Sequence, residues 1–283
     1  MSGKAAETTG EHGPAITEGL STVLSWLTVL PFRGATVFDR ITGRRAMAVL
    51  PVPGLVLGAA AVLICSVAEV VGFGPLVTAM LCVVSWALLT RMMHIDGLAD
   101  VGDALGSYAA PERAREIISD RYTGALGVTA VVLTVGVQVV ALSDLITSYS
   151  GVNGLLLVAV VPALARMAAM VGCSRLFRPF SRTGFGALII GTLPLRWIAL
   201  WWISISGLVG GTGALILPSG DVLPEVVTGV AFAGFVAVIF ALAVAGHLAR
   251  RLGGLNGDCI GALIEMSTAV VTLALLTAVH CRI

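Results

Sequence analysis

The sequence has few charged residues. Only 12% of its 283 residues are Asp, Glu, Lys or Arg, whereas a soluble globular protein carries about 25%. Hydrophobic residues make up 57% of the chain, and the mean hydropathy is +1.00. A single soluble core of this length cannot hide that much apolar surface. The composition therefore excludes an ordinary soluble domain and indicates a protein that lies in lipid.

The sequence also lacks a cysteine framework. Its five cysteines are scattered and lie mostly in or beside apolar runs: Cys65, Cys82, Cys173, Cys259 and Cys281. Without a CxxC pair we expect neither a disulfide scaffold nor a zinc motif, and we interpret the cysteines as small buried hydrophobic residues.

The amino-terminal segment lacks the marks of a removable signal peptide, which are a basic flank, an apolar run and a small-residue cleavage site. Residues 1–15 are polar, and we expect them to be disordered. Because no repeat or low-complexity tract follows, we predict that residues 16–283 form a single transmembrane helical domain.

Seven apolar runs are long enough to cross a bilayer as helices, which takes about 17 to 25 residues. They are residues 46–71, 75–93, 126–147, 154–173, 195–217, 224–247 and 261–281. An eighth apolar stretch, 16–32, is marginal in length and carries Glu18 and Pro31. We interpret it as an amphipathic helix at the interface or against the bundle. The predicted fold class is an all-α, polytopic integral membrane helical bundle.

The connections between these runs alternate in character. Three are short, turn-forming and free of Lys and Arg: 72–75, 148–154 and 218–224. The others hold most of the arginines: 33–45, 94–125, 174–194 and 248–260. The positive-inside rule places these four loops and the amino terminus together in the cytoplasm. Each single arginine has the simpler explanation that inside loops are basic, but that explanation does not cover the acidic residues.

The most unusual polar stretch directly follows the second apolar run. If the helix continues there, Asp96, Asp100 and Asp103 stand at i, i+4 and i+7 and fall within about 60° on one face. Like charges at this spacing repel each other, and no basic residue interleaves before Arg113. A bound divalent cation explains such a face, and magnesium prefers oxygen ligands of this kind. The alternative is a solvated helix start capped by Asp.

Residues beside this acidic face are also candidates for substrate binding. Gly97 and Gly102 allow a bulky group to approach the helix backbone. A lone histidine at the end of a span, such as His94, is usually an interfacial side chain with a satisfied hydrogen bond, and a direct role is the alternative.

Two further loops combine arginine with glycine. Arg121 and Gly124 lie at the entry to the third run, where free backbone N–H groups of a helix start can bind an anion. The alternative is an ordinary helix entry in which Asp120 pairs with Arg121. The second loop holds three arginines: Arg175, Arg178 and Arg182. They can grip phosphates in forked geometry or serve only as topology anchors.

The last polar loop leads into the final run. Gly253, Gly257 and Gly261 are four residues apart, a small-residue spacing that allows close helix packing. Asp258 and Glu265 are seven apart and share a helix face, with Glu265 about one turn inside the apolar run. An acid in that position indicates function by default. The alternative is that Glu265 is protonated or paired with an arginine of a span, such as Arg166.

Taken in order along nearly the whole chain, these motifs resemble the cobalamin synthase family, the adenosylcobinamide-GDP ribazoletransferases. The elements that carry the resemblance are L-T-x-L-P, Pro53-Gly54-Leu55, H-x-D-G-L-A-D-x-x-D, D-x-x-x-G-x-x-G and G-G-x-x-G-D-x-x-G-A-x-x-E. Three places depart from the family pattern. Asp120-Arg121-Tyr122 stands for Asp-Ser-Arg, Asn256-Gly257-Asp258 for Thr-Gly-Asp, and Thr268 for a second Glu.

The resemblance implies a multi-pass enzyme of the bacterial cytoplasmic (inner) membrane, with its active face in the cytoplasm. It implies transfer of cobinamide phosphate from adenosylcobinamide-GDP to α-ribazole or its 5′-phosphate, with release of GMP and dependence on Mg²⁺. Together with the residue chemistry it predicts catalytic and metal-binding roles for four acids: Asp96, Asp100, Asp103 and Asp258. It predicts substrate binding by His94, Gly97, Arg121, Gly124, Arg175, Arg178, Arg182, Gly254, Asn256, Gly257 and Glu265.

Two other functions are weighed against this one. A CDP-alcohol-type phospholipid phosphotransferase also places Asp near Gly on membrane helices, but its Ala-Arg pair after the first Asp-Gly is absent. A membrane transporter predicts acids near the bilayer midplane and two related halves with broken helices. We expect the lipid bilayer as a partner and no nucleic acid. The sequence leaves open whether the chain forms a homo-oligomer or binds other cobalamin-assembly enzymes.

Overall fold

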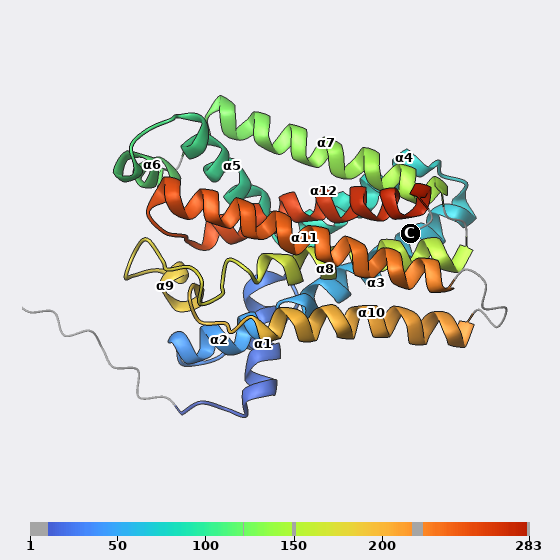
Figure 1. Cartoon of the computed structure of the whole chain (residues 1–283), viewed down its shortest axis with the longest axis horizontal. Coiled ribbons are helices and arrows are strands. Elements are labelled where there is room, and N and C mark those ends of the chain that lie inside the picture. Colours follow the sequence, from blue (N-terminus) through green and yellow to red (C-terminus); the bar gives the residue numbers. More distant parts are fainter. Residues whose placement is uncertain (1–10, 121, 149–150, 217–222, 282–283) are drawn as a thin grey trace, which may run out of the picture.

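The structure is a computed structural model that describes residues 11–120, 122–148, 151–216 and 223–281. Every regular element in these ranges is a helix (Figure 1), which confirms the all-α prediction. The first six helices are α1 (Ala15–Leu27), α2 (Arg40–Ala48), α3 (Pro51–Val71), α4 (Pro75–Leu89), α5 (Met93–Gly106) and α6 (Pro111–Ile118). The others are α7 (Ala125–Ser148), α8 (Gly151–Ala169), α9 (Phe185–Ile189), α10 (Arg196–Ile216), α11 (Leu223–Leu252) and α12 (Gly257–Cys281).

The described residues contain five helices that are long and apolar enough to cross a membrane. They are the continuous α2–α3 unit, α7, α10, α11 and α12. The second predicted span, 75–93, corresponds to α4, which is too short to span a membrane alone and passes the length test only together with α5, to which it is bent by 91°. The fourth predicted span corresponds to a shorter apolar helix, Gly154–Ala169. The seven expected spans are thus five unbroken helices, one bent pair and one short helix.

The short helix α8 forms the centre of the molecule. Its carboxyl-terminal half is buried on every side, and Val161, Leu164 and Met167 are each 0% exposed. Helices α3, α10, α11 and α12 pack around it (Figure 1). A helix that is hydrophobic all round is expected in such a core. Its apolar character therefore reflects burial in protein rather than contact with lipid.

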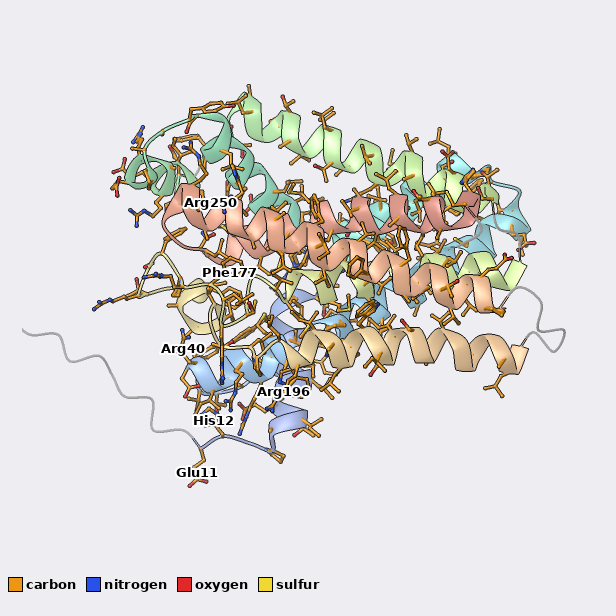
Figure 2. The ribbon with its side chains drawn as sticks, in the orientation of Figure 1. Glu11, His12, Arg40, Phe177, Arg196 and Arg250 are labelled. Atoms are coloured by element: carbon orange, nitrogen blue, oxygen red, sulfur yellow. The ribbon has the colours of Figure 1, made fainter. Side chains whose placement is uncertain are left out.

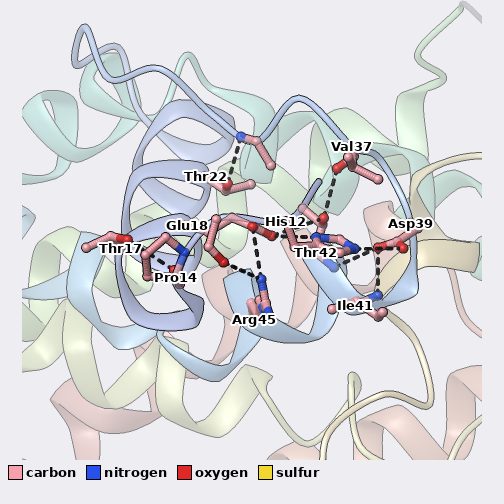
Figure 3. A network of polar contacts seen from close by, with 12 residues as sticks. His12, Pro14, Thr17, Glu18, Thr22, Val37, Asp39, Ile41, Thr42 and Arg45 are labelled. Atoms are coloured by element: carbon pink, nitrogen blue, oxygen red, sulfur yellow. Dashed lines mark hydrogen bonds and ion pairs between the residues drawn. The ribbon is translucent and has the colours of Figure 1, made fainter. Parts of the chain in front are cut away.

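Helix α1 confirms the helix predicted within residues 16–32 and packs against α2 and α3. A polar network holds it there (Figure 3). His12 bonds to Glu18 at 3.1 Å and to Asp39 at 3.2 Å, and Arg45 donates to Glu18 at 2.9 Å. Asp39 also caps α2 by accepting from the N–H groups of residues 41 and 42. Residues 1–10 of the expected disordered tail lie outside the described residues.

The polar loops gather at one end of the bundle. Figure 2 shows Arg40, Arg196 and Arg250 there, together with His12 and Glu11, although these residues are far apart in the sequence. The turn between α3 and α4 lies at the opposite end (Figure 1). The grouping predicted from the arginines is therefore present in the fold, and the side of the membrane on which it lies stays a prediction.

The free cysteines largely follow the interpretation as small hydrophobic residues. Cys82, Cys173 and Cys259 are buried, and Cys65 is half-buried. Cys281, near the carboxyl terminus, differs because it is exposed.

Candidate active site

A sharp turn between α4 and α5 sets the direction of the acidic helix. Arg91 and Met92 both adopt left-handed backbone, with φ of 56° and 58°. Such a conformation costs a non-glycine residue about 1–3 kcal/mol and persists only where the surroundings enforce it. The Arg91 guanidinium donates to the backbone carbonyl of Trp26, which ties the turn to α1. The turn directs α5 across the start of α12.

Helix α5 meets α12 at two glycines. A Cβ at Gly97 would lie 2.8 Å from the carbonyl oxygen of Asp258, and one at Gly261 would lie 3.1 Å from the Cα of His94. The bulky group that the sequence predicts beside Gly97 is therefore the backbone of α12. Glycine is required here because a side chain would push the two helices apart.

This packing brings four carboxylates together at the polar end of the bundle. Asp96 and Asp100 lie on α5 as the spacing predicted. Asp100 is within electrostatic reach of Asp96, Asp103 and Asp258, and Asp258 is within reach of Asp96. The acidic groups of the two motifs, distant in the sequence, thus form one negatively charged site.

Asp103 has a second set of contacts. Its carboxylate accepts from the backbone N–H of Gly124 at 2.5 Å and of Gly127 at 2.8 Å. The start of α7 was predicted to bind an anion, and the anion that it binds in the structure is this side chain. Gly124 is therefore engaged by the protein itself, and Asp103 holds α7 against α5. The companion candidate Arg121 lies outside the described residues.

The chemistry of these side chains fits magnesium, although they do not converge on one point. Within the described ranges, the side-chain carboxylates of Asp96 and Asp100 form no hydrogen bond or ion pair. The same ranges contain no group of three or more His, Cys, Asp or Glu side chains placed to hold a metal ion. Free carboxylate oxygens without a cationic partner are the ligands that Mg²⁺ takes. Holding an ion here requires a change of side-chain rotamers.

The predicted arginine loop lies at the same end of the molecule. It is joined to the start of α12 by backbone bonds, from Leu255 N–H to the carbonyl of Arg178 and from Phe180 N–H to the carbonyl of Leu255. Gly254, with φ of +149°, permits this contact because a Cβ there would lie 2.6 Å from the nitrogen of Phe180. Three exposed guanidinium groups have no side-chain partner in the described ranges: Arg175, Arg178 and Arg182. They are free to bind an anion but contact none of the acids.

A cavity of about 680 Å³ lies beside the acidic site; we name it the α1–α12 cavity. It is half-open and is lined by α1, α2, the start of α5, the loop around α9, and the start of α12. Of the predicted residues, His94, Asn256, Gly257 and Asp258 line it. Asn256 donates to Asp258 at 2.6 Å and accepts from the N–H of Cys259, so it caps α12 and orients the acid.

Sequence reasoning missed the aromatic wall of this cavity, formed by Trp26, Phe38, Phe180 and Phe185. These residues belong to segments that are far apart in the chain, and they carry no motif. Trp26 lies directly before the L-T-x-L-P element, which is the only signal in the sequence that points to this wall.

Glu265 lies inside the bundle and does not line the α1–α12 cavity. It accepts a hydrogen bond from Gln138 at 2.8 Å and lies within electrostatic reach of Arg166, which is 3% exposed. A small void of about 20 Å³ lies between these three side chains, enough for one water. Glu265 therefore has protein partners in place, although no ion pair with Arg166 within 4.0 Å occurs among the described residues. Its predicted role in substrate binding stays a prediction.

His94 differs from the usual interfacial histidine. Its side chain is buried, at 4% exposure, and neither ring nitrogen has a hydrogen-bond partner in the described part of the chain. Because an unpaired buried polar group is costly, its presence beside a cavity indicates a role for the ring.

Comparisons with known proteins agree on one family. The family described as Cobalamin-5-phosphate synthase matches residues 19–276. A curated adenosylcobinamide-GDP ribazoletransferase of Corynebacterium efficiens is 49% identical over 279 residues, covering 99% of this chain and 98% of the relative. The enzymes of the same name from Corynebacterium diphtheriae and Frankia casuarinae are 40% and 34% identical. They cover 96% and 90% of this chain, and 96% and 92% of their own lengths. No solved structure matches the chain.

Proposed function

Because this chain belongs to the cobalamin-5-phosphate synthase family, we propose that it is an adenosylcobinamide-GDP ribazoletransferase of a bacterial cytoplasmic membrane. The observation that carries the proposal is the 49% identity with a ribazoletransferase over 99% of the chain. The acidic site supports it, since four carboxylates that lie together can hold magnesium, and magnesium neutralises the charge of a diphosphate. The arginine loops at the same end support a site that faces the cytoplasm.

The reaction is a phosphoryl-group transfer. A ribose hydroxyl oxygen of α-ribazole, or of its 5′-phosphate, forms a bond to the phosphorus nearer cobinamide. The bond from that phosphorus to the bridging oxygen breaks, and GMP leaves with this oxygen. The hydroxyl proton passes to a carboxylate of the site or to water. Positioning and electrostatic stabilisation supply most of the rate enhancement in chemistry of this kind.

The residues have separate parts in this proposal. Asp96 and Asp100, with Asp258 beside them, would hold magnesium, and Asp103 would keep the start of α7 in place. When bound, magnesium supplies the positive charge that neutralises the diphosphate oxygens. The exposed guanidinium groups of Arg178 and Arg182 bind the outer phosphate oxygens in forked geometry.

An assay of the detergent-solubilised protein tests this function. Adenosylcobinamide-GDP and α-ribazole are incubated with the protein, with magnesium or with EDTA, and the products are separated by chromatography. We expect a cobalamin and GMP in equal amounts, and only with magnesium. Product formed in EDTA would remove the metal from the proposal. If no product forms in either condition, the proposed function is wrong, and the phospholipid-type phosphotransferase becomes the next candidate.

A variant and its control connect the assay to the site. Asp96→Asn should lower turnover at least 100-fold, the size of loss usual for a group that stabilises charge in the transition state. Glu112→Gln removes an exposed carboxylate of α6 whose one ion pair among the described residues is with Arg115, and it should leave turnover unchanged. If Asp96→Asn and Glu112→Gln have equal activities, the proposed catalytic role of Asp96 is wrong.

A further inference from the structure

The α1–α12 cavity lies next to the acidic site and differs from it because its wall is largely aromatic and apolar. We propose that it binds the acceptor, with the benzimidazole-like base of α-ribazole against its aromatic wall and the ribose toward Asp258. The diphosphate of the donor then lies on the acidic face of α5. This inference rests on the proposed function and adds to it the place of each substrate.

The size of the cavity matches the acceptor. Its volume of about 680 Å³ falls within the range of roughly 300–1,000 Å³ that encloses small ligands. α-Ribazole is a nucleoside of that ligand class. The donor carries a corrin ring and a nucleotide and is several times larger, so the cavity cannot enclose it.

The wall of the cavity suits a flat aromatic base. The Trp26 ring stacks on Phe38 with centroids 6.1 Å apart and meets Phe185 edge-on at 5.1 Å. Phe38 is 58% exposed and Phe185 is 41% exposed, so much of each ring is free of protein contact. Aromatic side chains with free faces bind nucleobases by stacking.

The polar groups of the cavity are placed for a ribose. His94 borders the cavity, and both of its ring nitrogens are buried and without a hydrogen-bond partner in the described residues. A turn of the ring toward the cavity brings one of them to a ribose hydroxyl, as donor or acceptor. Asp258 borders the cavity as well and lies within electrostatic reach of Asp96. Asp258 thus belongs to both the acidic site and the α1–α12 cavity. A ribose hydroxyl of α-ribazole beside Asp258 would face the phosphorus of the donor held at α5.

The lining argues against guanine or a phosphate as the occupant. Within the described residues, Arg91 is the only Lys or Arg of the lining, and it donates to the Trp26 carbonyl. Asp258 is the only carboxylate of the lining, and its partner is the amide of Asn256. The N–H donors at N1 and N2 of guanine require a free acceptor such as a carboxylate, and phosphates require free cations. A neutral base fits better.

The test measures the kinetic constants of each substrate separately. Trp26→Leu and Phe185→Leu remove aromatic faces and keep an apolar side chain. We expect each to raise KM for α-ribazole about 5- to 100-fold, the loss of one stacking contact. KM for adenosylcobinamide-GDP should stay within about twofold, since the donor lies at α5. Phe73→Leu is the control, because Phe73 is 48% exposed at the opposite end of the bundle.

Each outcome decides for or against the inference. A rise in KM for the donor in place of the acceptor would assign the cavity to the donor, and unchanged constants in both variants would overturn the site. Because Trp26→Leu can disturb α1, Phe185→Leu at the start of α9 provides a second variant on a different helix. Equilibrium dialysis with α-ribazole alone separates the two proposals. If α-ribazole binds in a way that depends on Phe185 but the protein shows no turnover, the binding site stands and the proposed reaction is wrong. If the protein turns over and Phe185→Leu has no effect, the reaction stands and the binding site is wrong.

Discussion

Asp100 and Asp103 lie one helical turn apart on α5, yet their surroundings give them different roles. The Asp100 carboxylate lies in the field of three other carboxylates and has no hydrogen bond in the described part of the chain. Asp103 accepts two backbone N–H groups at the start of α7. The charge of Asp100 thus opposes the fold, whereas that of Asp103 contributes to it.

The two acids should therefore respond oppositely to the same substitution. Asp100→Asn removes repulsion, so the magnesium-free protein should gain about 0.5–2 kcal/mol in stability while turnover falls at least 100-fold. Asp103→Asn replaces one of the two accepting oxygens with an NH2 group, so one N–H group at the start of α7 loses its acceptor, which should cost about 1 kcal/mol. Thermal unfolding of the detergent-solubilised variants and the transferase assay measure both effects. If the two variants unfold at the same temperature, the capping role of Asp103 is wrong.

At the scale of elements, the turn from α4 to α5 stores backbone strain at Arg91 and Met92. Met92→Gly relieves the left-handed conformation, which costs about 1–2 kcal/mol in a non-glycine residue. Met92→Ala keeps the strain and removes the same side chain. We expect the glycine variant to be more stable than the alanine variant by about 1 kcal/mol, measured by thermal unfolding in detergent. Equal stability of the pair would show that the turn is unstrained.

Helix α1 depends on charges that acid removes. Burial by itself raises the pKa of Glu18, but hydrogen bonding to His12 and the charge of Arg45 outweigh it and lower the pKa below its ordinary value. For Asp39 as well, burial by itself raises the pKa. The hydrogen bonds from the N–H of Thr42 and from His12 outweigh burial and lower the pKa below its ordinary value (Figure 3). A carboxyl whose folded pKa is depressed stabilises the fold above its unfolded pKa and loses that contribution as pH falls through the folded value.

The docking of α1 should therefore weaken as the pH falls below about 4, the ordinary pKa of these carboxyls. We expect the unfolding temperature to decline between about pH 5 and pH 3 and the decline to be shallower in Glu18→Gln. Glu112→Gln alters an exposed pair on α6 and should follow the wild-type profile. A Glu18→Gln variant with the full wild-type decline would show that Glu18 does not contribute to it.

The helices could largely be predicted from apolar run length, and the acidic face of α5 from the spacing of its aspartates. The 91° bend could not, because Thr90 and Arg91 mark only the end of an apolar run, and no Gly or Pro between residues 89 and 93 indicates a sharp turn. The bend comes from contacts with α1 and α12. The cavity wall was missed for the same reason, since Trp26 and Phe185 meet only after α1 and α9 have packed. The hydrogen bonds of Asp103 to the N–H groups at the start of α7 likewise could not be predicted, because they form only when α5 packs against α7.

At the scale of the whole molecule, the fold separates two ends. The start of α12, which carries Asp258 and lines the α1–α12 cavity, lies at the end where Arg40, Arg196 and Arg250 gather (Figure 2), and the carboxyl-terminal end of α12 lies at the other (Figure 1). Substrates built from GDP and corrinoids are made in the cytoplasm, so the proposed function requires the first end to face inward. The positive-inside rule gives the same orientation from the arginines alone.

This orientation can be measured with a membrane-impermeant maleimide on intact cells. Cys281 is exposed near the carboxyl terminus and should be labelled from outside, and Cys281→Ser should abolish that signal. Ser107 is exposed between α5 and α6, so Ser107→Cys in the Cys281→Ser background should react only after the cells are lysed. The buried Cys82, Cys173 and Cys259 should react slowly in either case. Labelling of Ser107→Cys in intact cells would place the acidic site outside the cytoplasm, where a GDP-activated donor made inside the cell cannot reach it.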